Sequence, residues 1–239
     1  MSTPRAKLHS PLPTVRKSPA AVEQICYTEA RHLMKPGDVI AFGGKERISN
    51  IIKWATRSNV SHVGVVLETT VLIEGHPQPQ RIVDVMESTT LYEDPVTGKK
   101  TAGVQRNRLS RRVEYNSGEM WWLPLSDESR QRMNGSAFVN FLLNQDRKAY
   151  DMKQAIKSGL DFLDEQGATY AKEDLSSFFC SELIAAAFEA AGIIQNINAS
   201  EVTPADLCAF ALYGKGYQLD GTPQRIKGFN SMNPEGFGI

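Results

Sequence analysis

The chain of 239 residues contains little cysteine and no excess of charge of either sign. Its three cysteines, Cys26, Cys180 and Cys208, are odd in number and far apart, and neither a CxxC nor an HExxH motif occurs. This pattern argues against a disulfide framework and against a metal site, so we expect no metal and no other cofactor. Lys plus Arg and Asp plus Glu number 27 each. Net charge therefore gives no general attraction to nucleic acid, and we expect no nucleic-acid partner.

Long apolar runs are also missing from the sequence. No stretch is long enough to span a bilayer, so we expect no transmembrane segment. Residues 1–17 carry prolines and basic residues but lack the hydrophobic core of a secretory signal, so we expect no Sec signal and synthesis in the cytoplasm. With 41% hydrophobic and 23% charged residues, the composition is that of a globular protein. We expect a flexible N-terminal arm over residues 1–17 and a single domain over residues 18–239.

The hydrophobic periodicity predicts an α+β fold. Strands are expected at residues 39–42, 61–68, 82–87, 103–109 and 119–125. Helices are expected at residues 18–33, 48–55, 127–144, 151–163 and 176–192, with a short one after Thr203. Consecutive strands with short, turn-rich links favour an antiparallel sheet over βαβ units. The tail from Gly214, rich in Gly and Pro, is expected to wrap over the surface.

The strongest helix pattern, residues 176–192, has a cysteine in its first turn. Ser176 or Ser177 can cap its start, and Gly192 suits the left-handed position after its end. Cys180 would then lie where unpaired backbone N–H groups and the positive end of the helix dipole favour the nucleophilic thiolate. The alternative is that Cys180 is a small buried hydrophobic residue, as free cysteines usually are. By the same reasoning, Cys26 and Cys208 are expected in the core.

A histidine and two carboxylates on the expected strands are candidate partners for that cysteine. His62 shares a strand face with Gly64, which leaves room for another segment to approach. Glu87 shares a face with Val85, whereas Asp84 points the other way, so Glu87 is the better candidate. A cysteine nucleophile needs an imidazole base, and the imidazole needs an acceptor that fixes its tautomer. A strand histidine and a carboxylate at a strand end also have ordinary structural roles, and residue pattern alone leaves both readings open.

Five blocks, in this order along the chain, resemble the circularly permuted papain-like cysteine hydrolases, in particular the YiiX-like branch of the NlpC-type cell-wall hydrolase superfamily. They are Gly37-Asp-Val-Ile, Ser61-His-Val-Gly-Val-Val, Val85-Met-Glu, Phe179-Cys-Ser-Glu-Leu-Ile and Thr203-Pro-Ala-Asp-Leu. The resemblance covers residues 34–210 and implies a permuted papain-like fold, in which an antiparallel sheet packs against helices. It also implies that Cys180 is the nucleophile, His62 the base and Glu87 the polar third member of a catalytic triad.

The resemblance carries further residues with it. Tyr150 matches a tyrosine that lines the substrate cleft in the family. Ser61 and Ser181, beside the histidine and the cysteine, are expected in substrate binding, and the Ser181 N–H or that of Cys180 could hold an oxyanion. Glu182 belongs to the cysteine block and is interpreted as structural. The basic segment 106–112 is either a solvated face or a site for an anionic substrate group.

The function implied is a cysteine amidase or endopeptidase that acts through a thioester, with peptidoglycan stem peptides as the favoured substrate. Without a Sec signal, the protein would reach the cell wall by another route, as a secreted effector or a phage-type lytic enzyme does, and an immunity or secretion partner would then be expected. Two alternatives remain. One is a thiol acyltransferase or esterase, as in the related lecithin retinol acyltransferase group. The other is a non-enzymatic binding domain in which Cys180 belongs to the core.

Overall fold

The computed structural model describes residues 23–44, 58–72, 80–93, 100–148, 178–195 and 197–228. Within these residues, seven strands form one sheet in the order β1-β7-β6-β2-β3-β4-β5. The strands are β1 (Glu23–Gln24), β2 (Val39–Gly43), β3 (His62–Leu72), β4 (Gln80–Glu93), β5 (Lys100–Arg108), β6 (Glu119–Leu123) and β7 (Tyr217–Asp220). The helices are α1 (Tyr27–Ala30), α3 (Leu109–Glu114), α4 (Asp127–Arg132), α5 (Gly135–Gln145), α7 (Phe178–Ala190), the 3-10 helix η2 (Ala199–Glu201) and α8 (Pro204–Ala209). The architecture is α+β, as the sequence predicts.

The meander β2–β5 is antiparallel throughout, as expected from the short links between these strands. β6 does not continue it but pairs with the other edge of β2. β7 extends the sheet beyond β6, and β1 pairs with β7 in parallel. The sheet is therefore mixed, and the expectation of a purely antiparallel sheet is wrong at this edge.

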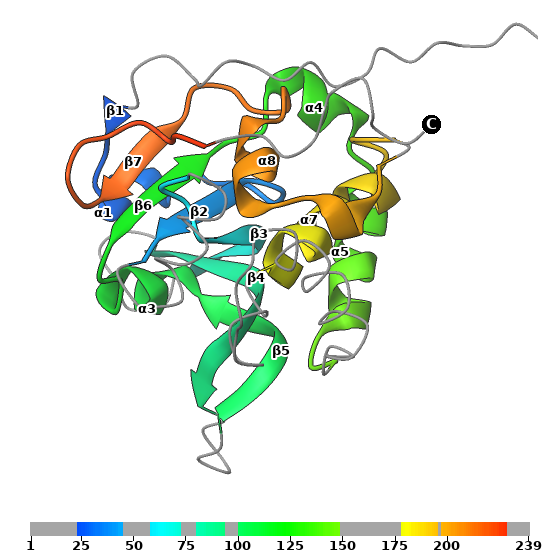
Figure 1. Ribbon diagram of the computed structural model, residues 1–239, viewed down its shortest axis with the longest axis horizontal. Helices are drawn as coiled ribbons and strands as arrows, with labels where there is room; N and C mark the ends of the chain where they lie inside the picture. Colours follow the sequence, from blue (N-terminus) through cyan, green and yellow to red (C-terminus); the bar gives the residue numbers. More distant parts are fainter. Residues whose placement is uncertain are drawn as a thin grey trace, which may run out of the picture.

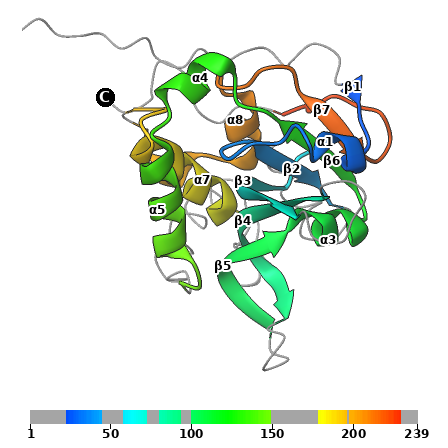
Figure 2. The same ribbon diagram turned by 180° about the vertical axis from the view of Figure 1, so that it is seen from behind.

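Two apolar cores lie on opposite faces of the sheet, because side chains alternate between the faces along each strand. In β2, Val39 and Ala41 belong to the larger core, whereas Ile40 and Phe42 belong to the smaller one. Residues of α5, α7 and α8 complete the larger core, and residues of α1 and α3 cover the smaller one. In Figures 1 and 2, α5 and α7 lie side by side at one end of the molecule, and β1 and β7 lie at the other.

Helix α7 confirms the helix predicted around Cys180. Ile184 and Phe188 are fully buried on the face that the apolar periodicity indicates. Gly192 adopts a positive φ of 74° just after the helix, a conformation that favours glycine. Because the helix begins at Phe178, Cys180 lies in its first turn. The capping serines expected at 176 and 177 lie outside the described residues.

The chain before β2 differs from the expected helix over residues 18–33. Its described part contains the strand β1 and a single helical turn, α1. Ile25 N–H donates to the carbonyl of Gln218, 3.0 Å away, so pairing with the sheet edge replaces helical hydrogen bonds there. As a consequence, Cys26 is exposed rather than in the core, and Leu33 is 56% exposed.

Two other expectations are also wrong in part. The helix expected over residues 127–144 is divided into α4 and α5, because the side chain of Asn134 accepts a hydrogen bond from Ala137 N–H and starts a new helix. The tail after Gly214 contributes β7 to the sheet instead of only wrapping the surface. The helices expected at residues 48–55 and 151–163 lie outside the described residues, as does the expected arm over residues 1–17.

The short helix α8 confirms its predicted start. Thr203 Oγ1 accepts from Asp206 N–H at 3.1 Å, and Asp206 accepts from Thr203 N–H at 3.0 Å, so the two residues form a capping box. Cys208 is buried within this helix, as expected.

Asp38, in the Gly37-Asp block, joins β2 to its neighbours. Its buried carboxylate accepts from Trp122 Nε1–H at 2.9 Å and from Leu125 N–H at 3.1 Å, and it pairs with Arg130. Burial raises the pKa of Asp38 despite these partners. The residue thus has a structural role between β2, β6 and α4.

A segment near the C-terminus, residues 224–228, holds the turn that leads into β3. The side chain of Asn59 donates to the carbonyl of Arg225 at 2.7 Å and accepts from Lys227 N–H at 2.7 Å. The backbone N–H of Asn59 donates to the carbonyl of Lys227 at 3.1 Å. Because His62 follows three residues later, this segment helps to fix where that histidine lies.

Candidate active site

β3 and β4 place a histidine beside a buried carboxylate. The register pairs Val65 with Met86, which brings Gly64 alongside Glu87. His62, the first residue of β3, contacts Glu87 through Nε2 and Oε2, which are 2.7 Å apart. Asp84 lies elsewhere and pairs with Arg106. The contact predicted between His62 and Glu87 rather than Asp84 is therefore confirmed.

Cys180 interacts with the same imidazole as Glu87. The thiol is fully buried, and α7 packs against β3 and β4. Burial lowers the pKa of His62, but the charge of Cys180, a hydrogen bond with Cys180 and the contact with Glu87 together raise it from 6.5 to about 9. Nε2 is the ring nitrogen engaged by Glu87. Near neutral pH the imidazole is thus protonated.

Three polar groups surround the carboxylate of Glu87, which is fully buried. Asn107 Nδ2 donates to Oε1 at 2.9 Å, and Arg112 Nε lies 2.9 Å from the same oxygen. Burial raises the pKa of Glu87, but the positive charge of Arg112, the contact with His62 and the hydrogen bond from Asn107 lower it to about 2. Glu87 is therefore ionised at every pH near neutrality.

Phe42 contacts both cationic groups of this cluster. It is paired with His62 across β2 and β3, and the two ring centroids are 5.4 Å apart with a tilt of 39°. On the same ring, the guanidinium carbon of Arg112 lies 4.8 Å from the centroid. The phenyl ring thereby limits how far either cation can move.

Sequence reasoning missed Phe42, Asn107 and Arg112 as members of the site. Phe42 was expected only as a strand residue, and the other two were grouped into the basic segment 106–112. One signal was available: a buried carboxylate such as Glu87 requires donors and a counter-charge. The neighbouring strand β5 supplies Asn107, and helix α3 supplies Arg112.

The basic segment 106–112 does not act as a single patch. Arg106 pairs with Glu68 and Asp84 on the surface, and Arg112 pairs with Glu87 in the interior. Arg108 and Arg111 are exposed. Two of its four arginines are thus engaged with carboxylates of the protein itself.

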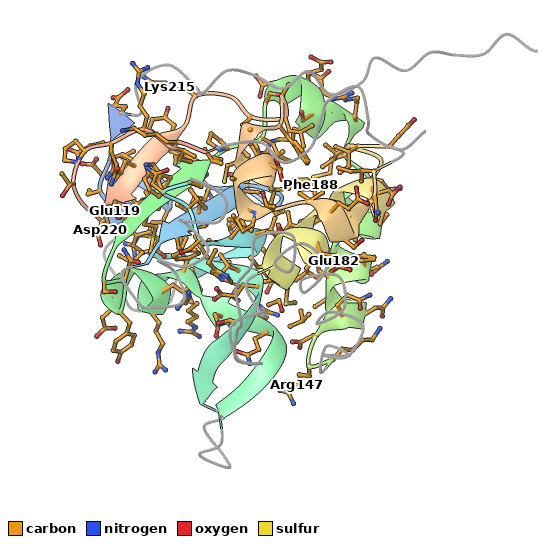
Figure 3. The ribbon with its side chains drawn as sticks, in the orientation of Figure 1. Glu119, Arg147, Glu182, Phe188, Lys215 and Asp220 are labelled. Atoms are coloured by element: carbon orange, nitrogen blue, oxygen red, sulfur yellow. The ribbon has the colours of Figure 1, made fainter. Side chains whose placement is uncertain are left out.

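The serines that were expected to bind substrate have internal partners for their hydroxyls. Ser61 Oγ donates to the carbonyl of Phe42 at 3.3 Å, and Ser181 Oγ donates to the carbonyl of Val202. Both side chains are buried, so any contact that they make with substrate would come from the backbone. Tyr150 lies outside the described residues. Glu182, on α7 in Figure 3, is half-buried, and burial raises its pKa.

The start of α7 offers backbone donors next to the thiol. The N–H groups in the first turn of a helix point out of its N-terminal end and favour negative charge there. Cys180 and Ser181 both belong to this turn. The thiol of Cys180, a protonated imidazole, an ionised carboxylate and the backbone N–H groups at the start of a helix therefore lie in one part of the structure.

The part of the chain that the structure describes contains no group of three or more His, Cys, Asp or Glu side chains that could hold a metal ion. Nor does any helix within it have the length and apolar composition to cross a membrane.

Comparison with known proteins gives little further information. No protein-family model matches the chain, and no curated protein sequence matches it either. One solved structure that the chain resembles is the metalloprotein YiiX from Escherichia coli O157:H7, with 16% identity and a TM-score of 0.39. The match covers 69% of each chain.

Proposed function

We propose that this protein is a cysteine hydrolase with a circularly permuted papain-like active site, which cleaves an amide bond through a thioester intermediate. One observation carries the proposal: Nε2 of His62 contacts the buried carboxylate of Glu87, and Cys180 interacts with the same imidazole by charge and by a hydrogen bond. This order of nucleophile, base and orienting acceptor is what thiol acyl transfer requires.

In the first half of the reaction, the Cys180 thiolate attacks the substrate's carbonyl carbon and forms a C–S bond. The carbonyl π electrons move to oxygen, and the backbone N–H groups at the start of α7 stabilise the oxyanion. When the oxyanion collapses, the C–N bond breaks. The imidazolium of His62 gives its proton to the leaving nitrogen, so an amine departs and a thioester remains on Cys180.

In the second half, water replaces the amine. Neutral His62 takes a proton from the water as its oxygen attacks the thioester carbonyl, and the C–S bond breaks as the second oxyanion collapses. The product is a carboxylic acid, and the thiolate and imidazolium are restored. Throughout the cycle, Glu87 holds Nε2 so that Nδ1 faces the sulfur. It does not take the proton itself, because its pKa is lowered to about 2.

Exposure indicates from which side the substrate arrives. The Cys180 side chain is fully buried, whereas the side chain of His62 is 14% exposed. We therefore expect the reacting carbonyl to enter past the exposed edge of the imidazole.

For the substrate, we propose an amide in a peptidoglycan stem peptide. The support is the resemblance of the histidine, acid and cysteine blocks to the YiiX-like branch of the NlpC-type hydrolases. The same triad would also transfer acyl groups from an ester, so the choice of substrate is the part of the proposal that needs a direct experiment.

That experiment is a digest of purified sacculi analysed by mass spectrometry, with Cys180→Ala as the control. We expect wild-type protein to release muropeptides cleaved at one amide, each with a new amino and a new carboxyl terminus, and the control to release none. Phospholipid and short-chain esters are tested in parallel. Hydrolysis of esters alone would overturn the proposed substrate. Absence of any Cys180-dependent product would overturn the hydrolase and favour a binding domain.

A further inference from the structure

Four ionisable groups from four elements follow one another through the site. They are Cys180 on α7, His62 on β3, Glu87 on β4 and Arg112 on α3. Glu87 is fully buried, and the side chains of His62 and Arg112 are only 14% and 19% exposed. With a thiolate and an imidazolium, the charges alternate in sign along this row. The first three groups have roles in the proposed reaction, but the fourth has none so far.

The contact of Arg112 with Glu87 is one of charge rather than of hydrogen bonding. Arg112 Nε lies 2.9 Å from Glu87 Oε1, yet its N–H has no hydrogen-bond acceptor among the described residues. The hydrogen bond to this oxygen comes from Asn107. Phe42 holds the guanidinium from the other side. The hydrogen bond from Asn107 can therefore orient the carboxylate, and Arg112 contributes a positive charge.

That charge matters because a buried carboxylate acts on its neighbours with little screening. If Glu87 were ionised without a counter-charge, it would hold the proton of His62 strongly. The proposed reaction needs His62 to give up that proton to the leaving nitrogen in every cycle, and a general acid works best when its proton affinity matches the working pH. A cation on the far side of the carboxylate weakens this hold.

We infer that Arg112 is a positioning residue that offsets the charge of Glu87, so that the carboxylate orients His62 without trapping its proton. The inference rests on the proposed function, since it assigns Arg112 to that same site. Glu87 still raises the pKa of the imidazole, but it holds the proton less strongly than a buried carboxylate without a counter-charge would.

Other charged groups near the site face different partners. On α8, Cys208 interacts electrostatically with Cys180, and Asp206 interacts with Cys208. Asp206 is also engaged in its capping box with Thr203. Arg106 is paired with Asp84 and Glu68. Within the described residues, Arg112 is thus the arginine that pairs with Glu87. It contacts Oε1, whereas His62 contacts Oε2.

The test measures the proton affinity of His62 directly and needs no substrate. The full chain with Cys180→Ala serves as the background, so that the imidazole titrates without coupling to the thiol. The His62 signal is followed by NMR against pH and is assigned by its loss in His62→Gln. In this background, Arg112→Met is expected to raise the titration midpoint by about one pH unit. Arg112→Lys keeps the charge and is expected to change it little.

Two comparisons make the result decisive. Arg111→Met removes a positive charge from the adjacent, exposed position, where solvent screens it, so the midpoint is expected to stay unchanged. Glu87→Gln and the double variant Glu87→Gln/Arg112→Met complete a thermodynamic cycle. From highest to lowest midpoint, the expected order is Arg112→Met, the unaltered background, the double variant and Glu87→Gln.

The double variant also guards against misfolding, because it leaves neither charge of the pair alone in the interior. If Arg112→Met does not fold, the double variant is compared with Glu87→Gln alone. Equal midpoints in these two, or an unchanged or lowered midpoint in Arg112→Met, would overturn the inference. The titration involves no turnover. If the midpoints follow the expected order but no substrate is hydrolysed, the charge balance is retained and the proposed function is refuted. Cys180-dependent hydrolysis of a substrate, without the expected order of midpoints, would refute only the role of Arg112.

Discussion

Replacement of His62 by Ala is expected to lower turnover by about 10³-fold, because one imidazole serves as the proton donor of acylation and as the base of deacylation. The loss should appear in the rate constant of the chemical step rather than in binding, since the side chain is mostly buried and contacts Glu87 and Cys180. Initial rates on the substrate identified in the sacculus and ester panel provide the measurement.

His32 offers a matched control for this substitution. It is an exposed histidine outside the row of charged groups, so His32→Ala should retain the wild-type rate. Near wild-type turnover in His62→Ala, with the fold intact by circular dichroism, would place the base at another residue.

Replacement of Glu87 by Gln is expected to have the largest effect on stability. The carboxylate is fully buried between Arg112 and His62, and removal of one partner from a buried ion pair leaves the remaining charges uncompensated. The pKa of Glu87 is lowered from 4.5 to about 2, which corresponds to a contribution on the order of 3 kcal/mol to the free energy of unfolding near pH 7.

The lowered pKa also fixes how this contribution depends on pH. A carboxylate whose folded-state pKa is depressed stabilises the protein above its unfolded-state pKa, and this stabilisation is lost as the pH falls through the folded-state value. The difference between wild type and Glu87→Gln should therefore be full between pH 4.5 and pH 6.5 and shrink toward pH 2. It should also decrease as the pH rises toward 9, because His62, whose raised pKa depends in part on Glu87, then loses its proton. Urea unfolding at a series of pH values gives the difference.

Asp84→Asn is the control, since Asp84 lies on the same strand and pairs with Arg106; the two side chains are 13% and 40% exposed, so solvent reaches this pair. Surface pairs contribute little, and we expect a loss below about 1 kcal/mol. Equal losses in the two variants, or a Glu87→Gln loss that does not change with pH, would contradict the assigned charge state.

The parts of the fold that the sequence predicted depend on local patterns. The helix start formed by Thr203 and Asp206 depends on only four consecutive residues, and the positive φ of Gly192 follows from the end of its own helix. The contact of His62 with Glu87 followed from the alternation of side chains along one strand, which placed Glu87 opposite to Asp84.

The parts that were not predicted depend on partners distant in sequence. Cys26 is exposed because β1 pairs with β7 near the other end of the chain, and no local pattern shows that pairing. Arg112 was interpreted as part of a surface patch because its partner Glu87 lies on another element. Asn134 divides a helix whose apolar periodicity continues through the break, since its side-chain cap outweighs that periodicity.

The central claim is that Cys180 and His62 form a reactive ion pair, and alkylation of the wild-type protein at pH 6 tests it most directly. The chain supplies its own references: Cys26 is exposed, whereas Cys208 is buried and its pKa is raised by that burial. At this pH an ordinary exposed thiol is ionised to well under about 1%. An imidazolium beside a thiol stabilises the reactive thiolate.

The folded protein is treated with iodoacetamide, and the labelling of each cysteine is followed by peptide mass spectrometry. We predict that Cys180 is labelled first despite its burial, then Cys26 and last Cys208, and that His62→Ala removes the lead of Cys180. If Cys26 is labelled first, while Cys180 reacts as slowly as Cys208 and does not respond to His62→Ala, the protein has the arrangement of the triad without its chemistry.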